Sequence, residues 1–122
     1  MVRMIYCIMR KEGVSMQDFR DFFNGEHQEA VCTIAKDLKC KEFKQSLTLM
    51  VERNFTLMVR RGTEMPYDGV IELWWDNAAD LEEVMETEEI QQKAEDFFVR
   101  SSHYIDMSKS RAFFTEQPKS CS

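Results

Sequence analysis

The chain has 122 residues, 43% of them hydrophobic and 31% charged, which is typical of one soluble globular domain. We expect that domain to span residues 1–116, with a frayed C-terminal tail over 117–122. The net charge of −6 argues against nucleic acid or an anionic membrane as a partner. No apolar run is long enough for a membrane helix. The four cysteines show no metal-type spacing and no CxxC pair, which predicts a cytoplasmic protein with reduced thiols.

The first half of the chain predicts a strand, a helix and a second strand. The segment 2–10 has the composition of a strand and is followed by a turn at Gly13. Ser15, three residues before Asp18, marks a helix start. Apolar residues then recur at intervals of three, four and seven as far as Leu38, and Asn24-Gly25 is a point where this helix could break. The segment 40–50 alternates as a strand does.

The second half is less regular. The segment 51–65 has no clear helix period, and we interpret it as an extended arm to a dimer partner, a lid or an edge strand. A strand is predicted over 70–75, followed by a short helix that Asn77 caps and that runs through Met85. Thr87 opens another helix, over 88–99. The segment 105–114 predicts a last strand, which Ser108 could interrupt.

The strand over 70–75 is the centre of the predicted fold. Because successive side chains of a strand point to opposite faces, Val70, Glu72 and Trp74 share one face. The other face carries Ile71, Leu73 and Trp75. Both faces are mostly large and apolar, which predicts a central strand that is covered on both sides. Glu72 is the exception, because a buried carboxylate must be paired, hydrogen-bonded or neutral.

The element order is strand, helix, strand, strand, helix, strand, which predicts a ferredoxin-like α+β sandwich built on a split βαβ unit. The predicted helices cover only one face of such a sheet. Since bulky apolar groups on the other face cannot stay in water, we expect a two-fold partner whose sheet packs against it. The protein is therefore predicted to be a homodimer in which two sheets pack face to face.

His27 is the most informative single residue of the sequence. It lies four positions after Phe23 and four before Val31, on the apolar stripe of the first helix. One interpretation is a core histidine bonded to a backbone carbonyl. The other is an acid or base that faces a pocket between helix and sheet, since imidazole titrates near neutrality. The only other histidine, His103, has polar neighbours and is predicted to lie at the surface.

If His27 belongs to an active site, several other residues are candidates for the same site. Glu72 could orient the His27 ring or act as a base, or else pair with an arginine or lysine at the dimer face. Tyr6 could donate a hydrogen bond to a substrate oxygen, or be a core aromatic. Candidate walls for a flat, apolar ligand are Phe23, Trp74 and Trp75, although the tryptophans are equally suited to a core.

The sequence also lacks several motifs. It has no glycine-rich phosphate loop, no GxSxG nucleophile elbow, no HExxH and no clustered metal ligands. We therefore predict neither a cofactor nor a metal, and proton transfer without a cofactor is the chemistry that the side chains support. The nine methionines indicate core filling more than a pocket that tolerates varied ligands.

Three segments of the chain together resemble the EthD-like branch of the dimeric α+β barrel superfamily, which includes 4-methylmuconolactone methylisomerase and fungal EthD-type dehydratases. The first runs from Ser15 through Phe19-Arg20 to His27, like the family's S-x-x-x-F-R…H pattern. The second is 67–75, similar to its D-G-x-x-E-x-W pattern, and the third comprises Ile105-Asp106 and 113–116. The resemblance implies a homodimer, a cavity between each sheet and its own helices, and His27 as the acid/base group.

On this basis we hypothesise a cofactor-free lyase or isomerase that moves a proton on a small hydrophobic lactone, phenol or polyketide-like molecule. Two alternatives stay open. One is a cofactor-independent oxygenase, as related barrels support. The other is a non-enzymatic ligand-binding or accessory protein of an oxidation pathway, in which His27 is only a core residue.

Overall fold

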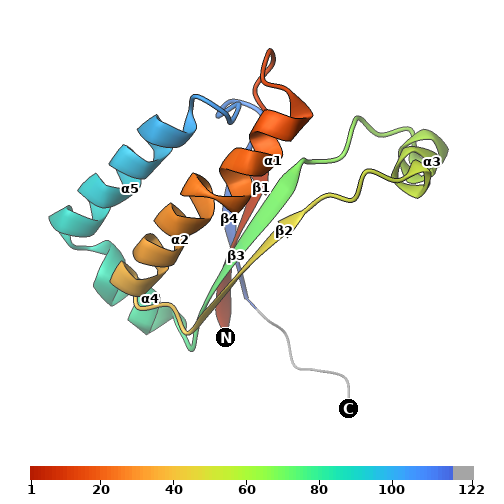
Figure 1. The fold of residues 1–122 in the computed structure, drawn as a ribbon. Helices are drawn as coiled ribbons and strands as arrows, with labels where there is room; N and C mark the ends of the chain where they lie inside the picture. Colours follow the sequence, from red (N-terminus) through yellow and green to blue (C-terminus); the bar gives the residue numbers. More distant parts are fainter. Residues whose placement is uncertain (117–122) are drawn as a thin grey trace.

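The computed structural model describes residues 1–116, so the tail predicted over 117–122 lies outside the described residues. Strands and helices alternate along the chain as in the predicted ferredoxin-like order, with additional short helices (Figure 1). In chain order they are β1 (Val2–Ile8), α1 (Met16–Asn24), α2 (Glu26–Asp37), β2 (Glu42–Leu47), α3 (Glu52–Arg61), β3 (Gly69–Trp75), α4 (Ala78–Met85), α5 (Glu88–Ser101) and β4 (Arg111–Glu116).

The four strands form one sheet in the order β2-β3-β1-β4, and every neighbouring pair is antiparallel. This is the arrangement that the split βαβ pattern predicts, so the α+β ferredoxin-like fold is confirmed. Helices α1, α2, α4 and α5 lie together against one face of the sheet (Figure 1). Strand β3 is central, as its apolar faces predict, because it pairs with β1 on one side and β2 on the other.

Local sequence signals set the ends of these helices. The side chain of Ser15 accepts a hydrogen bond from the Asp18 N–H at 3.0 Å and caps α1. Asn77 caps α4 in the same way, and Thr87 caps α5. Such oxygens satisfy N–H groups that have no partner in the first turn of a helix. The predicted break at Asn24-Gly25 is also confirmed, since α1 ends there and α2 begins at the next residue.

Two segments differ from the sequence prediction. The segment predicted as an extended arm or lid contains a helix, α3, which stands apart from the helix layer (Figure 1). No residue of α3 is buried, and Gly62 ends it with a φ of 64°. The last strand begins at Arg111 and not at residue 105, because the carboxylate of Asp106 accepts hydrogen bonds from the backbone of Ser108 and Lys109 and holds a turn.

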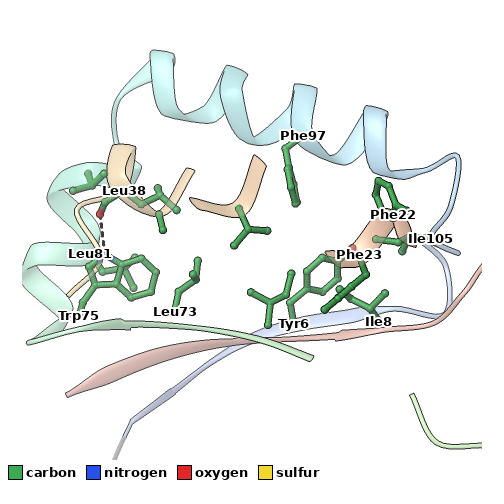
Figure 2. Packing of buried hydrophobic residues seen from close by; sticks show 14 of the residues in the cluster. Tyr6, Ile8, Phe22, Phe23, Leu38, Leu73, Trp75, Leu81, Phe97 and Ile105 are labelled. Atoms are coloured by element: carbon green, nitrogen blue, oxygen red, sulfur yellow. Dashed lines mark hydrogen bonds between the residues drawn. The ribbon is translucent and has the colours of Figure 1, made fainter. Parts of the chain in front are cut away.

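The core lies between the sheet and the helix layer. On β3 the residues that face the helices are Gly69, Ile71, Leu73 and Trp75, all buried. The Trp75 indole donates a hydrogen bond at 2.9 Å to the carbonyl oxygen of Leu38, where α2 ends (Figure 2). Burial of these side chains supplies the main stabilisation of the fold, about 1.5–3 kcal/mol for each large apolar group.

The other face of the sheet carries no helix (Figure 1). It presents Ile5 and Cys7 from β1 and Val70 from β3, all half-buried, with the exposed Phe113 from β4. The homodimer that would cover this face stays a prediction. Among the described residues, no helix combines the length and the apolarity needed to cross a membrane.

Candidate functional site

The candidate site is built where α1 passes into α2. Phe22 and Phe23 lie in the last turn of α1, and His27 lies in the first turn of α2. Gly25, between the two helices, has its Cα so close to the Asp21 carbonyl that an added Cβ would lie 3.0 Å from that oxygen. The break turns α2 so that all three side chains point into the core, where each is buried.

Three phenylalanine rings surround the His27 imidazole. Ring centroids lie 5.0 Å away for Phe22, 5.3 Å for Phe23 and 5.2 Å for Phe97. Phe97 comes from α5 and points down toward the sheet (Figure 2). The imidazole is only 1% exposed. Apolar neighbours on several sides exclude water, and the ring therefore lies in a medium that disfavours charge.

The electrostatics of His27 follow from this setting. Burial lowers the pKa of the imidazole from 6.5 to about 4, while the side chain of Gln45 opposes the shift by favouring the protonated ring. The histidine is therefore neutral at pH 7. Neither ring nitrogen makes a well-formed hydrogen bond, and both amide atoms of Gln45 are likewise buried without a partner. Each unpaired buried group of this kind costs about 1–3 kcal/mol, so the core histidine bonded to a backbone carbonyl is not what the structure contains.

A cleft of about 440 Å³ lies beside the imidazole, between α2 and α5. His27, Phe22 and Phe97 contribute to its wall, together with Ala30 and Ile34. Its rim is charged: the α2 residues are Glu26, Glu29 and Asp37, and the α5 residues are Lys93, Asp96 and Arg100. No residue of the sheet contributes to its wall, so this cleft between two helices is not the hollow that was expected above the third strand. His27 contributes to the wall of this cleft but is almost fully buried, so a molecule in the cleft meets only a small part of the imidazole.

Glu72 does not share a site with His27, and the prediction that it could face the same pocket is wrong. Its side chain points to the uncovered face of the sheet, opposite the helices. There it lies 3.6 Å from the guanidinium of Arg3, the pairing that the alternative interpretation expects. Trp74 is on the same face, with the cationic groups of Arg3 and Lys44 at 5.6 and 5.4 Å from its ring centroid. The period of a strand forces this separation.

The remaining candidates lie on the core side of the sheet. Phe23 packs directly on His27, whereas Trp75 belongs to the other end of the core, against Leu38 (Figure 2). The two tryptophans therefore cannot wall one pocket. Tyr6 is buried, its hydroxyl lies 3.8 Å from the Met107 sulfur, and burial raises its pKa to about 12. A protonated phenol suits a hydrogen-bond donor, but Tyr6 does not line the cleft.

Gln45 is the residue that sequence reasoning missed. It lies on β2 between Phe43 and Leu47, which also face the helices. The sequence could have identified it, because Gln45 is a glutamine between two apolar residues on the buried side of a strand. A buried amide needs hydrogen-bond partners. Only the fold brings it against His27, which lies on another element.

A second, smaller hollow of about 220 Å³ lies under α3, away from His27. Four methionines contribute to its wall, Met9, Met16, Met50 and Met65. Some methionines of this chain thus line a cavity, and one of them, Met16, also packs against the core. Within residues 1–116, no three His, Cys, Asp or Glu side chains gather as they would around a metal ion. Cys7, Cys32 and Cys40 are unpaired thiols.

The sequence matches the family model of the EthD domain over residues 11–99, which is most of the chain. The chain belongs to the EthD domain family. The matched region contains His27 and Gln45, as well as both helices of the cleft except the last residues of α5. No curated protein matches the sequence.

Solved structures give the same fold at low sequence identity. An EthD family protein from Bacillus halodurans C-125 superposes with a TM-score of 0.62 at 15% identity, over 97% of this chain and 99% of that chain. A dimeric protein of ferredoxin-like fold from Bacteroides fragilis NCTC 9343 gives 0.61 at 10% identity, over 95% of both chains. SnoaB, a cofactor-independent oxygenase from Streptomyces nogalater, gives 0.56 at 7% identity, over 98% of this chain and 94% of that chain. These likenesses establish the fold of the EthD domain.

Proposed function

We propose that this EthD-domain protein is a cofactor-free lyase or isomerase that moves a proton on a small hydrophobic lactone, phenol or polyketide-like molecule. The observation that supports it is His27: a buried, neutral imidazole with two unpartnered nitrogens beside a cleft between α2 and α5. The aromatic rings around it suit a flat, apolar substrate.

In the proposed step, the unprotonated nitrogen of His27 accepts a proton from carbon next to a substrate carbonyl. The electron pair of the broken C–H bond moves into the carbonyl group and forms an enolate. The imidazolium then returns the proton to another substrate atom, which gives an isomer, or to a leaving hydroxyl group, which departs as water. A pKa of about 4 makes the resting ring a weak base, but the negative enolate beside it favours the protonated form during the step.

The test is hydrogen–deuterium exchange. The protein is incubated in D₂O with a panel of enolisable lactones, phenols and 1,3-dicarbonyl compounds, and loss of C–H signals is followed by NMR. We expect protein-dependent exchange that His27→Ala abolishes while the circular dichroism spectrum is retained. His103→Ala is the matched control, since that histidine is exposed. Exchange at the wild-type rate in His27→Ala would remove His27 from the reaction.

Two other functions have specific support. The name of SnoaB as a cofactor-independent oxygenase supports oxygen chemistry on a substrate that itself reacts with oxygen. Oxygen consumption with such a substrate would separate this function from proton transfer, which consumes none. The low basicity of His27 supports a ligand-binding or accessory protein of an oxidation pathway. In that case the same compounds bind to His27→Gln and to the wild type with equal affinity, and neither protein exchanges their C–H protons.

We also propose that two copies pair through the uncovered sheet faces and that the protein acts in the cytoplasm. The half-buried apolar groups of that face support the pairing. The unpaired thiols support a reducing compartment. A monomeric mass in light scattering at micromolar concentration would contradict the homodimer.

A further inference from the structure

Gln45 places polar atoms in the core without hydrogen-bond partners, which is unfavourable, and packing at this position does not require a polar side chain. Strand β2 alternates between exposed residues and half-buried ones, and the half-buried positions are Phe43, Gln45 and Leu47. In the sheet, Gln45 pairs with the buried Ile71 of β3. A leucine at this position would leave no polar atom without a partner. Gln45 has two such atoms, its amide oxygen and its amide nitrogen.

The same lack of partners is found on His27, across the core from β2. Both nitrogens of the ring are buried and unpartnered, and the Gln45 side chain lies close enough to favour the protonated imidazole. Gln45 faces the helix layer from β2, and α2, which carries His27, packs against that strand. The amide and the ring make no regular hydrogen bond. Rotation of the amide would pair its oxygen with a ring N–H and satisfy one atom on each side.

We infer that Gln45 is the positioning residue of His27: its amide oxygen accepts the N–H on the sheet side of the ring and leaves the other nitrogen free to act toward the α2–α5 cleft. The inference rests on the proposed function of His27 as an acid/base group. An imidazole has two neutral tautomers, and only one of them directs a lone pair at a substrate in the cleft. A base oriented by a third group is a general feature of acid–base sites.

The choice of an amide suits a neutral histidine. A carboxylate at position 45 would attract a second proton onto the ring, whereas an amide orients the ring without charging it. The charged groups of the cleft rim belong to α2 and α5, where acidic Glu26, Glu29, Asp37 and Asp96 accompany basic Lys93 and Arg100. The charged neighbours of Gln45 on β2, Glu42 and Lys44, point to the opposite face of the sheet. Gln45 is thus the polar group that acts on the ring from β2.

The test needs no substrate, because the tautomer of a histidine can be observed by long-range ¹H–¹⁵N NMR correlation in the whole protein. We expect His27 to populate one tautomer in the wild type and a mixture, or the opposite tautomer, in Gln45→Leu. We expect Gln45→Glu to raise the pKa of His27 by about one to three units, as an adjacent carboxylate does. Gln28→Leu, an exposed glutamine beside His27 on α2, is the matched control and changes neither property.

If Gln45→Leu and Gln45→Glu, both folded by circular dichroism, leave the tautomer and the pKa of His27 unchanged, the inference is refuted. This outcome is distinct from failure of the proposed function. If the Gln45 variants change the tautomer but His27 never supports C–H exchange, Gln45 positions the ring and the proton-transfer proposal alone fails. If exchange depends on His27 and not on Gln45, the positioning role alone fails.

Discussion

Gly69 controls the packing under the candidate site. It lies on the core side of β3, and a Cβ at this position would come within 2.9 and 3.1 Å of two carbons of the Phe23 ring and 3.3 Å from the Ser46 carbonyl oxygen. Contacts near 3 Å are too close, so Gly69→Ala must displace the ring. Phe23 is 2% exposed and stacks on His27. The added methyl group should therefore disturb stability and the histidine together.

The magnitude follows from two opposing effects. Overpacking a core costs about 1–3 kcal/mol, and replacing glycine in a strand returns about 0.5–1 kcal/mol through backbone entropy. We expect a net loss of about 1–2 kcal/mol in the free energy of unfolding. With a urea dependence of about 1.5–2 kcal/mol per molar for a chain of this size, the midpoint should fall by about 1 M.

The assay is urea unfolding followed by tryptophan fluorescence, with Phe23→Leu and the double variant included. If the methyl group acts through the Phe23 ring, the smaller leucine makes room for it. The loss caused by Gly69→Ala should then shrink by more than 0.5 kcal/mol in the Phe23→Leu background, as in a double-mutant cycle for touching residues. A midpoint equal to that of the wild type, or an equal loss in both backgrounds, would refute the reasoning.

Three further predictions concern the histidine, the tryptophans and the uncovered face. Because folding lowers the pKa of His27 from 6.5 to about 4, the unfolded chain binds the proton first, and stability present above pH 6.5 is lost as the pH falls toward 4. One pKa unit corresponds to about 1.4 kcal/mol. Between pH 7 and pH 4, the free energy of unfolding measured with urea should therefore fall by about 3 kcal/mol more in the wild type than in His27→Gln. Equal decreases in the two proteins would contradict a neutral buried ring. Trp75→Phe removes a bond to Leu38 and leaves a cavity, so it should cost about 2–4 kcal/mol in thermal unfolding. Trp74→Phe, on the other face of the sheet, should cost under about 1 kcal/mol, and equal costs would show that the two rings are not separated as described. Ile5→Asp, on the uncovered face, should halve the mass in light scattering if two copies pair there, whereas Gln28→Asp on α2 should not.

Most of the secondary structure could be predicted because its signals are local. Ser15, Asn77 and Thr87 each cap a helix through a bond to a backbone N–H three residues ahead. Alternation along β3 separated its two faces correctly, since the period of a strand needs no tertiary contact. Helix α3 was missed although its apolar residues fall on one side of the helix, a period that the sequence prediction did not recognise. That side is not buried in the core, because no residue of α3 is buried.

The candidate site was predicted only in part. Its histidine stands on an apolar stripe, which the sequence displays directly. Which face of β3 receives the helices is not a local property, since both faces are apolar. For this reason the sequence left open whether Glu72 faces His27 or pairs with a basic residue, and the structure pairs it with Arg3.

The sequence by itself determined the order of the elements, most of their ends, and the presence of a histidine on the inner side of the first helical region. Tertiary structure alone decided that His27 meets Gln45, that three phenylalanine rings enclose it, and that the cleft opens between α2 and α5. The physical reason is that backbone hydrogen bonding and side-chain period act over a few residues. Burial and pairing of polar groups depend instead on segments that are distant in the chain and become neighbours only when the sheet and helices pack together.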